Sequence, residues 1–126
     1  MIHIRKAVPS DAQGIAKVHV ESWKTTYINI VPEDFLNNLS FEKRADYWFS
    51  AIPNGGVYVA EAENNQIVGF VSGGKERSGN YSNYNGEIYA IYILKEYQGT
   101  GIGKLLIEPI VKELTNQGVI TMLVLV

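Results

Sequence analysis

Residues 86–114 read GEIYAIYILKEYQGTGIGKLLIEPIVKEL, and the rest of the chain is organised around this stretch. It begins with a run of β-branched and aromatic residues at 87–94, which predicts a strand. Three glycines then alternate at positions 99, 101 and 103, and an amphipathic helix follows. The first turn of a helix offers free N–H groups and the positive end of the helix dipole, and glycines let an anion approach the backbone closely. The stretch therefore predicts a phosphate-binding loop.

Two common phosphate loops do not match these residues. A Walker loop needs a glycine where this chain has Gln98, and a Ser or Thr where it has Leu105. A dinucleotide fingerprint starting at Gly99 needs its third glycine where this chain has Lys104. Residues 98–103, QGTGIG, do fit the pattern Gln/Arg-x-x-Gly-x-Gly/Ala. In this context the loop resembles the acetyl-CoA loop of the GNAT superfamily of N-acetyltransferases.

The resemblance extends over nearly the whole chain. The segment YAIYILKEYQGTGIGKLL looks like the family's fourth strand and third helix, and IRKAVPSDAQGIAKVHVESW looks like its first strand and first helix. It implies an α/β (α+β) fold, with a mixed central sheet flanked by helices, in one domain over residues 1–126. The family fold normally continues past the fifth strand, so we expect a C-terminally incomplete, truncated domain, or a homodimer in which a partner chain completes the open sheet edge.

Composition narrows the classes of function. The chain has 126 residues, 46% of them hydrophobic, and no cysteine, which excludes disulfides, thiolate metal sites and a cysteine nucleophile. Its net charge is −2, without a long run of one sign, so we expect no nucleic-acid partner. No apolar run has the length of a signal or of a membrane span, so we expect a cytoplasmic protein with no membrane partner. Two lone histidines, His3 and His19, make no metal site, and we expect them to be structural or exposed.

Hydrophobic periodicity predicts the elements before the glycine loop. A strand is expected at 2–8, followed by a helix that a capping box of Ser10 and Gln13 opens and that ends near Thr25. Two short helices are expected at 33–39 and 41–52, the second with an inner face of Phe41, Ala45, Trp48 and Phe49. A hairpin then joins strands 57–63 and 66–73 through Asn64 and Asn65, and residues 74–85 form a loop.

The helix after the loop has its predicted buried face at i, i+4 spacing, made of Ile102, Leu106, Ile110 and Leu114. Pro109 lies inside it and should kink it. Residues 119–126 form an apolar run of buried-strand length.

The GNAT resemblance assigns the cofactor contacts to the backbone. The pantetheine arm of acetyl-CoA lies along Ile91, Tyr92 and Ile93 almost as an added strand, and the amide of Ile93 faces the thioester carbonyl. The pyrophosphate is held at the start of the helix by Gln98, Gly99, Thr100, Gly101, Ile102, Gly103 and Lys104, with added charge from Lys104. The alternatives are that the strand residues belong only to the core, and that the glycines form a turn without a ligand.

The resemblance also implies a general base, Glu87, which in some relatives acts through water. If strand pairing is regular, Glu87 shares a face with Ile91 and Ile93, and a β-bulge would change that face. The alternative is a solvated carboxylate at a strand end. The family's general acid is a tyrosine beyond the fifth strand, which this chain lacks, and Tyr92 and Tyr97 are the nearest substitutes in sequence.

The acceptor side is predicted from the segment WKTTYINIVPEDFL. Trp23 and Tyr27 are candidate substrate-binding walls, with Glu33 and Asp34 as partners for a cationic amine, although aromatic residues in such helices also serve the core. We expect an N-acetyltransferase that uses acetyl-CoA and no metal, and whose small-molecule or peptide amine acceptor attacks directly in a ternary complex. The amine itself stays open between a polyamine, an antibiotic, an amino acid and a protein N-terminus. The alternative is a truncated, non-catalytic module that binds CoA or dimerises.

Overall fold

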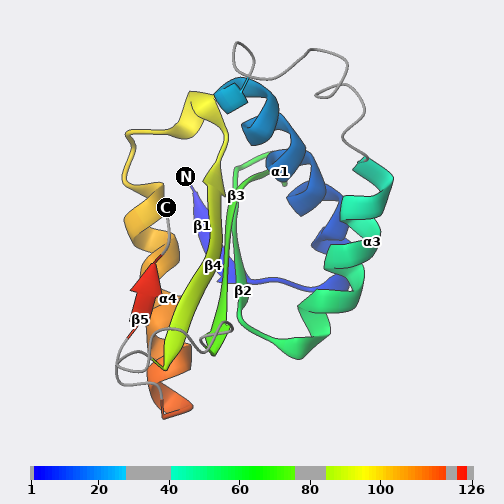
Figure 1. Ribbon diagram of the computed structural model, residues 1–126. Helices are drawn as coiled ribbons and strands as arrows, with labels where there is room; N and C mark the ends of the chain where they lie inside the picture. The colour runs from blue at the N-terminus through cyan, green and yellow to red at the C-terminus, as the bar shows by residue number, and fades with distance from the viewer. Residues whose placement is uncertain (1, 28–40, 76–84, 119–121, 125–126) are drawn as a thin grey trace.

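A computed structural model describes residues 2–27, 41–75, 85–118 and 122–124. In this part of the chain the sheet has five strands, in the order β1 (His3–Lys6), β2 (Val57–Glu61), β3 (Ile67–Lys75), β4 (Gly86–Ile93) and β5 (Met122–Val124) (Figure 1). Neighbouring strands are antiparallel from β1 to β4, and β5 pairs with β4 in parallel. The mixed sheet confirms the predicted fold class, with β5 at one edge.

Helices cover both faces of the sheet (Figure 1). On one face lie α1 (Ala12–Tyr27) and α3 (Phe41–Ala51). Their contact with the sheet is centred on Phe70 of β3, whose ring packs against His19 of α1 and Trp48 of α3. This face therefore carries the aromatic part of the core.

The other face is covered by α4 (Ile102–Asn116). Its buried residues confirm the predicted stripe, since the exposed fractions of Ile102, Leu106, Ile110 and Leu114 are all 2% or less. On β3, Gly69 and Gly73 leave room for this stripe. A Cβ at Gly73 would lie 3.3 Å from Ile110, and one at Gly69 would lie 3.5 Å from Leu106. Pro109 does lie within α4, and the kink stays a prediction.

The start of α1 differs from the prediction. A 3₁₀ turn, η1 (Pro9–Asp11), precedes the helix, and Asp11 rather than Ser10 does the capping. Its carboxylate accepts the Val8 N–H at 2.8 Å and two hydrogen bonds from the Arg5 guanidinium at 2.7 and 2.9 Å. The predicted Ser10–Gln13 capping box is therefore wrong, because the acid next to Ser10 reaches both β1 and the free amide. Burial alone would raise the pKa of the Asp11 carboxyl, but the hydrogen bonds from Arg5 and Val8 lower it.

The inner face of α3 was predicted only in part. Trp48 is buried, with 3% of its surface exposed, whereas Phe49 is 60% exposed and the prediction for it is wrong. The buried stripe continues instead to Ile52, in the short turn η2 (Ile52–Asn54) that follows α3. Ile52 follows Trp48 by four residues, which is about one helical turn, so the two lie on the same face. Phe49 follows Trp48 by one residue and therefore lies about 100° around the helix.

The β2–β3 hairpin confirms its predicted turn, because Asn65 has the expected positive φ of 65°. β3 runs two residues beyond its predicted end, to Lys75. β5 lies inside the predicted strand 119–126, while the predicted helix 33–39 falls outside the described residues. Among the described helices, none combines the length and apolar character that a membrane span needs. A homodimer through the β5 edge stays a prediction.

Candidate functional site

The two edges of β4 differ along its length. One edge pairs with β3 from Gly86 to Ile93. The other pairs with β5 over Gly86–Ile88 only, against Met122–Val124. From Tyr89 onward, no strand in the described part of the chain pairs with this second edge, which lies beside the glycine loop.

The directions of the backbone groups of β4 follow from one hydrogen bond. The Leu94 N–H donates to the Val68 carbonyl at 2.9 Å, which points the Leu94 amide toward β3. Amides alternate along a strand, so Tyr92 also points toward β3, while Ile91 and Ile93 point their N–H and C=O groups toward the open edge. This orientation suits an extended ligand that pairs with β4 as a strand would.

The glycine loop has the conformation that close approach requires. Gly99 and Gly101 have φ angles of +78° and +85°, which L-residues with a side chain rarely adopt. A Cβ built at either position meets nothing within 4 Å. The loop therefore borders open space that a bound group can fill.

The N-terminus of α4 faces this space. Its first helical hydrogen bond runs from the Leu105 N–H to the Gly101 carbonyl at 3.2 Å. The N–H groups of Ile102, Gly103 and Lys104 precede it, and helix geometry leaves them without intrahelical partners. The exposed Lys104 adds a positive charge at the same helix end. Three amides, a helix dipole and a lysine fit a pyrophosphate.

Gln98 differs from the rest of the predicted set, because both its backbone N–H and its side-chain amide already donate a hydrogen bond within the protein. Its N–H donates to the Lys95 carbonyl at 3.2 Å, and its side-chain Nε2 donates to the Ile93 carbonyl at 3.0 Å. Thr100 likewise uses its Oγ1 to donate to the Tyr97 carbonyl at 2.6 Å. These two side chains shape the loop and tie it to the end of β4.

Glu87 lies on the other face of the sheet from Ile91 and Ile93. A β-bulge interrupts the β3–β4 register, so that Ala90 and Ile88 oppose consecutive residues of β3 and Tyr89 is the extra residue. Pairing is therefore not regular, and a bulge changes the face of Glu87, as the sequence analysis allowed. The glutamate shares the α1–α3 face with Phe70 and is buried, with 5% of its surface exposed.

His19 and Tyr92 stack on this same α1–α3 face. Their ring centroids are 4.9 Å apart, with an angle of 23° between the planes. Burial, together with the charge of Arg44, lowers the pKa of His19 to about 4, so the imidazole is neutral at physiological pH. The structural role expected for His19 is confirmed by this packing, and the stack places α1 directly over the strand that carries Ile91 and Ile93.

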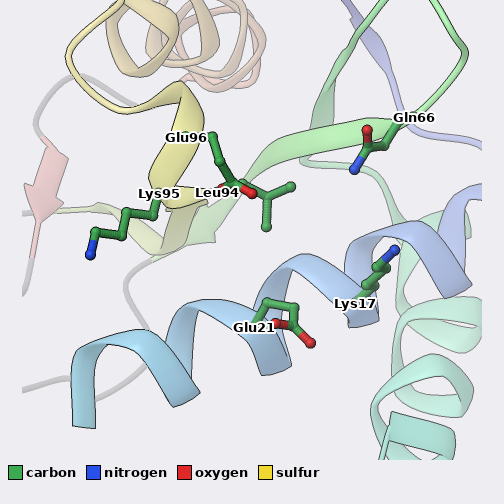
Figure 2. Close-up of a pocket in the computed structure, with 6 residues that line it drawn as sticks. All are labelled: Lys17, Glu21, Gln66, Leu94, Lys95 and Glu96. Carbon is green, nitrogen blue, oxygen red and sulfur yellow. The ribbon is translucent and has the colours of Figure 1, made fainter. Parts of the chain in front are cut away.

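A pocket of about 570 Å³ opens beside the segment that joins β4 to the glycine loop (Figure 2). Lys17 and Glu21 of α1 border it opposite Leu94. The remaining lining residues are Gln66, Lys95 and Glu96. Sequence reasoning missed this pocket, because exposed charges on a helix give no signal of which cavity they border.

Several predicted site residues fall outside what the structure describes. The side chains of Trp23 and Tyr27 are among them, and so are Glu33 and Asp34. Tyr97 is half-buried in the turn η3 (Lys95–Tyr97), next to the glycine loop. Within the described ranges, no group of three or more His, Cys, Asp or Glu side chains could hold a metal ion.

Comparison with known proteins supports one family. The model of the acetyltransferase (GNAT) family matches residues 19–126. The chain is 42% identical over 124 residues to YuaI of Bacillus subtilis (strain 168), described as an uncharacterized N-acetyltransferase, covering 98% of this chain and 70% of YuaI.

Solved structures show the same fold. The PaiA N-acetyltransferase from Thermoplasma acidophilum, in complex with coenzyme A, superposes with a TM-score of 0.76 at 26% identity, covering 100% of this chain and 79% of that one. A GNAT family acetyltransferase from Brucella melitensis, in complex with acetyl-CoA, gives a TM-score of 0.69 at 21% identity, covering 100% and 76%. The family model and the close relative confirm the resemblance carried by the strand, loop and helix, and the chain belongs to the GNAT family of acetyltransferases.

Proposed function

We propose that this protein transfers the acetyl group of acetyl-CoA to a primary amine, by direct attack in a ternary complex. The observation that carries the proposal is the open edge of β4, which leads straight into a glycine loop with free helix N-terminal amides. A long ligand with an anionic end and an amide-containing arm matches both parts. Relatives described with bound CoA or acetyl-CoA support this choice of co-substrate.

The direction of β4 sets where the thioester lies. The pyrophosphate sits at the loop, which follows Ile93, so the arm runs back along the strand and its thioester end is the end farthest from the loop. In this arrangement the Ile93 N–H hydrogen-bonds the pantetheine arm, and the Ile91 N–H, which is nearer the bulge, hydrogen-bonds the thioester carbonyl. We therefore propose Ile91, in place of the expected Ile93, as the contact of the thioester carbonyl. A backbone N–H aimed at the carbonyl oxygen stabilises the charge that develops there during attack.

The bonds formed and broken in the chemical step all belong to the amine and to acetyl-CoA. The amine nitrogen forms a bond to the carbonyl carbon while the C–S bond breaks, and the thiolate leaves. An alkylammonium has a pKa near 10.4, so the amine must lose a proton before it attacks, and the thiolate takes one up afterwards. Glu87 is the proposed proton acceptor. It lies four residues before Ile91, about 13 Å along the strand, so the proton reaches it through water.

The test joins a thiol-release assay, run with acetyl-CoA and a panel of primary amines, to calorimetric titration of CoA. Glu87→Gln should lower kcat about 100-fold near pH 7 and leave the Kd of acetyl-CoA unchanged. Glu108→Gln, which removes an exposed carboxylate from α4, is the matched control and should change neither quantity. Full activity in Glu87→Gln would remove Glu87 from the mechanism, while absence of CoA binding would overturn the proposed function.

A further inference from the structure

Of the four buried side-chain polar atoms that lack a hydrogen-bond partner in the described structure, one is Glu113 Oε2 of α4, and the other three come from α1 and α3. They are His19 Nδ1, Ser22 Oγ and Trp48 Nε1. The His19 and Trp48 rings lie 6.4 Å apart, edge to face, and Ser22 follows His19 by one turn of α1. Buried polar groups are almost always satisfied, so a cluster of three points to a missing partner.

The chemistry of the cluster favours an acceptor as that partner. An indole N–H can only donate, a hydroxyl can donate, and a neutral imidazole carries one N–H that Nδ1 can present. Trp48 is 97% buried as a residue, since only 3% of its surface is exposed, so its N–H has no access to bulk water in place of a partner.

Arg44 adds a positive charge to this cluster. It lies on α3 one turn before Trp48 and is half-buried, and its charge contributes to the lowered pKa of His19. Among the described residues it forms no ion pair. A water molecule could satisfy one or two of the buried donors, but it would bring no negative charge to Arg44. A guanidinium beside several N–H and O–H donors is the arrangement that binds a carboxylate.

From this cluster we infer that Arg44, Trp48, Ser22 and His19 form a carboxylate subsite, and that the acceptor is an amine that also carries a carboxylate, as an amino acid does. The inference rests on the acetyl transfer proposed above and selects among its open acceptors. It disfavours a polyamine, because a cationic chain would add charge beside Arg44 and would leave the donors unpaired.

The position of the cluster fits this role. His19 lies on the ring of Tyr92, the residue between the two whose backbone groups face the open edge of β4. A carboxylate held beside His19 therefore keeps the attached amine near the thioester end of the arm. The three donor atoms are covered, so entry of a ligand displaces neighbouring side chains, and we expect binding to be tighter once CoA has filled its own site.

The experiment is calorimetric titration of the protein in the presence of CoA, with L-alanine and L-leucine, each beside its amide, and with spermidine. We expect both amino acids to bind at least tenfold more tightly than their amides. In Arg44→Gln, the Kd of each amino acid should become nearly equal to the Kd of its amide. Trp48→Phe should raise the Kd of the amino acids several-fold. Lys43→Gln removes an exposed positive charge from the same helix and should leave the discrimination intact.

Equal binding of acids and amides by the wild-type protein would overturn the inference, as would tighter binding of spermidine or full discrimination in Arg44→Gln. Arg44 is half-buried rather than part of the core, so this variant keeps the test valid if Trp48→Phe fails to fold. The kinetic form of the test compares the acid-to-amide ratio of kcat/KM in variant and wild type, which cancels the different amine pKa values. Binding is read without turnover, so failure of acetyl transfer and failure of the carboxylate subsite are told apart.

Discussion

Adding one methyl group to the glycine loop should separate cofactor binding from folding. Gly101 and Gly118 flank α4 at its two ends, with φ angles of +85° and +91°, and a Cβ at either meets nothing within 4 Å. Gly101→Ala and Gly118→Ala therefore impose the same backbone strain, about 1–2 kcal/mol, without a clash inside the protein. Both variants should fold, with Tm lowered by a similar few degrees.

Only Gly101→Ala should weaken acetyl-CoA binding. Its methyl group enters the space in front of the free α4 amides and holds the pyrophosphate away from them. Loss of about one charge-assisted hydrogen bond corresponds to about 2–3 kcal/mol, or roughly a 30- to 150-fold increase in Kd. Gly118 lies at the far end of the helix, so Gly118→Ala should bind acetyl-CoA as the wild type does.

The assay is calorimetric titration of acetyl-CoA into the wild type and the two variants, with thermal unfolding measured on the same samples. Equal affinity in the two variants would refute the assignment of the loop to the pyrophosphate, since they share the strain and differ only in where the methyl group lies. Weak binding in both would show that α4 stability, not loop geometry, controls affinity.

Three further predictions concern stability. Gly56→Ala should prevent folding, because its new Cβ would clash with the carbonyl oxygen of Gly73 on β3 and the residue has a φ of +74°. Gly55→Ala is the control and should cost only backbone strain. Circular dichroism and thermal melts distinguish the two variants. Asp11→Ala should cost about 2 kcal/mol in urea unfolding, since it removes two hydrogen bonds from Arg5, which keeps its contact with Glu61, and leaves the Val8 amide unpaired; a loss below 0.5 kcal/mol would contradict the capping role. Burial and the charge of Arg44 lower the pKa of His19 from 6.5 to about 4. Between these two pH values the imidazole is therefore protonated in the unfolded chain but stays neutral in the folded protein. Stability should therefore fall between pH 6.5 and 4 by about 2 kcal/mol, roughly half of the full pKa difference because the ring is partly open to water, and His19→Phe should flatten this slope.

Local patterns predicted the parts of the site that depend on the backbone alone. The alternating glycines require positive φ, and positions 99 and 101 have it. The four-residue spacing from Ile102 to Leu114 fixes which face of α4 is buried, because helix geometry leaves no other choice. These features are encoded within a few neighbouring residues, so the sequence is sufficient to find them.

Features that depend on two distant segments could not be predicted in this way. The bulge at Tyr89 is a property of how β3 and β4 pair, and nothing in the letters of β4 marks the extra residue. The stack of His19 on Tyr92 joins residues 73 positions apart, and its geometry depends on how α1 crosses the sheet. Phe49 was misplaced because an aromatic residue next to the true stripe looks equally apolar in sequence.

Because only one edge of β4 is paired along its whole length, the amides of this strand should differ in how fast they exchange hydrogen with solvent. The Leu94 amide is hydrogen-bonded to β3, and by alternation so is that of Tyr92, so both should exchange slowly. The amides of Ile91 and Ile93 face the open edge and should exchange faster. A ligand that pairs with this edge would slow hydrogen exchange at the amides of Ile91 and Ile93 alone. Ligand binding would therefore change exchange at every second residue of β4, which is the period of a β-strand, although the enzyme itself forms no new strand.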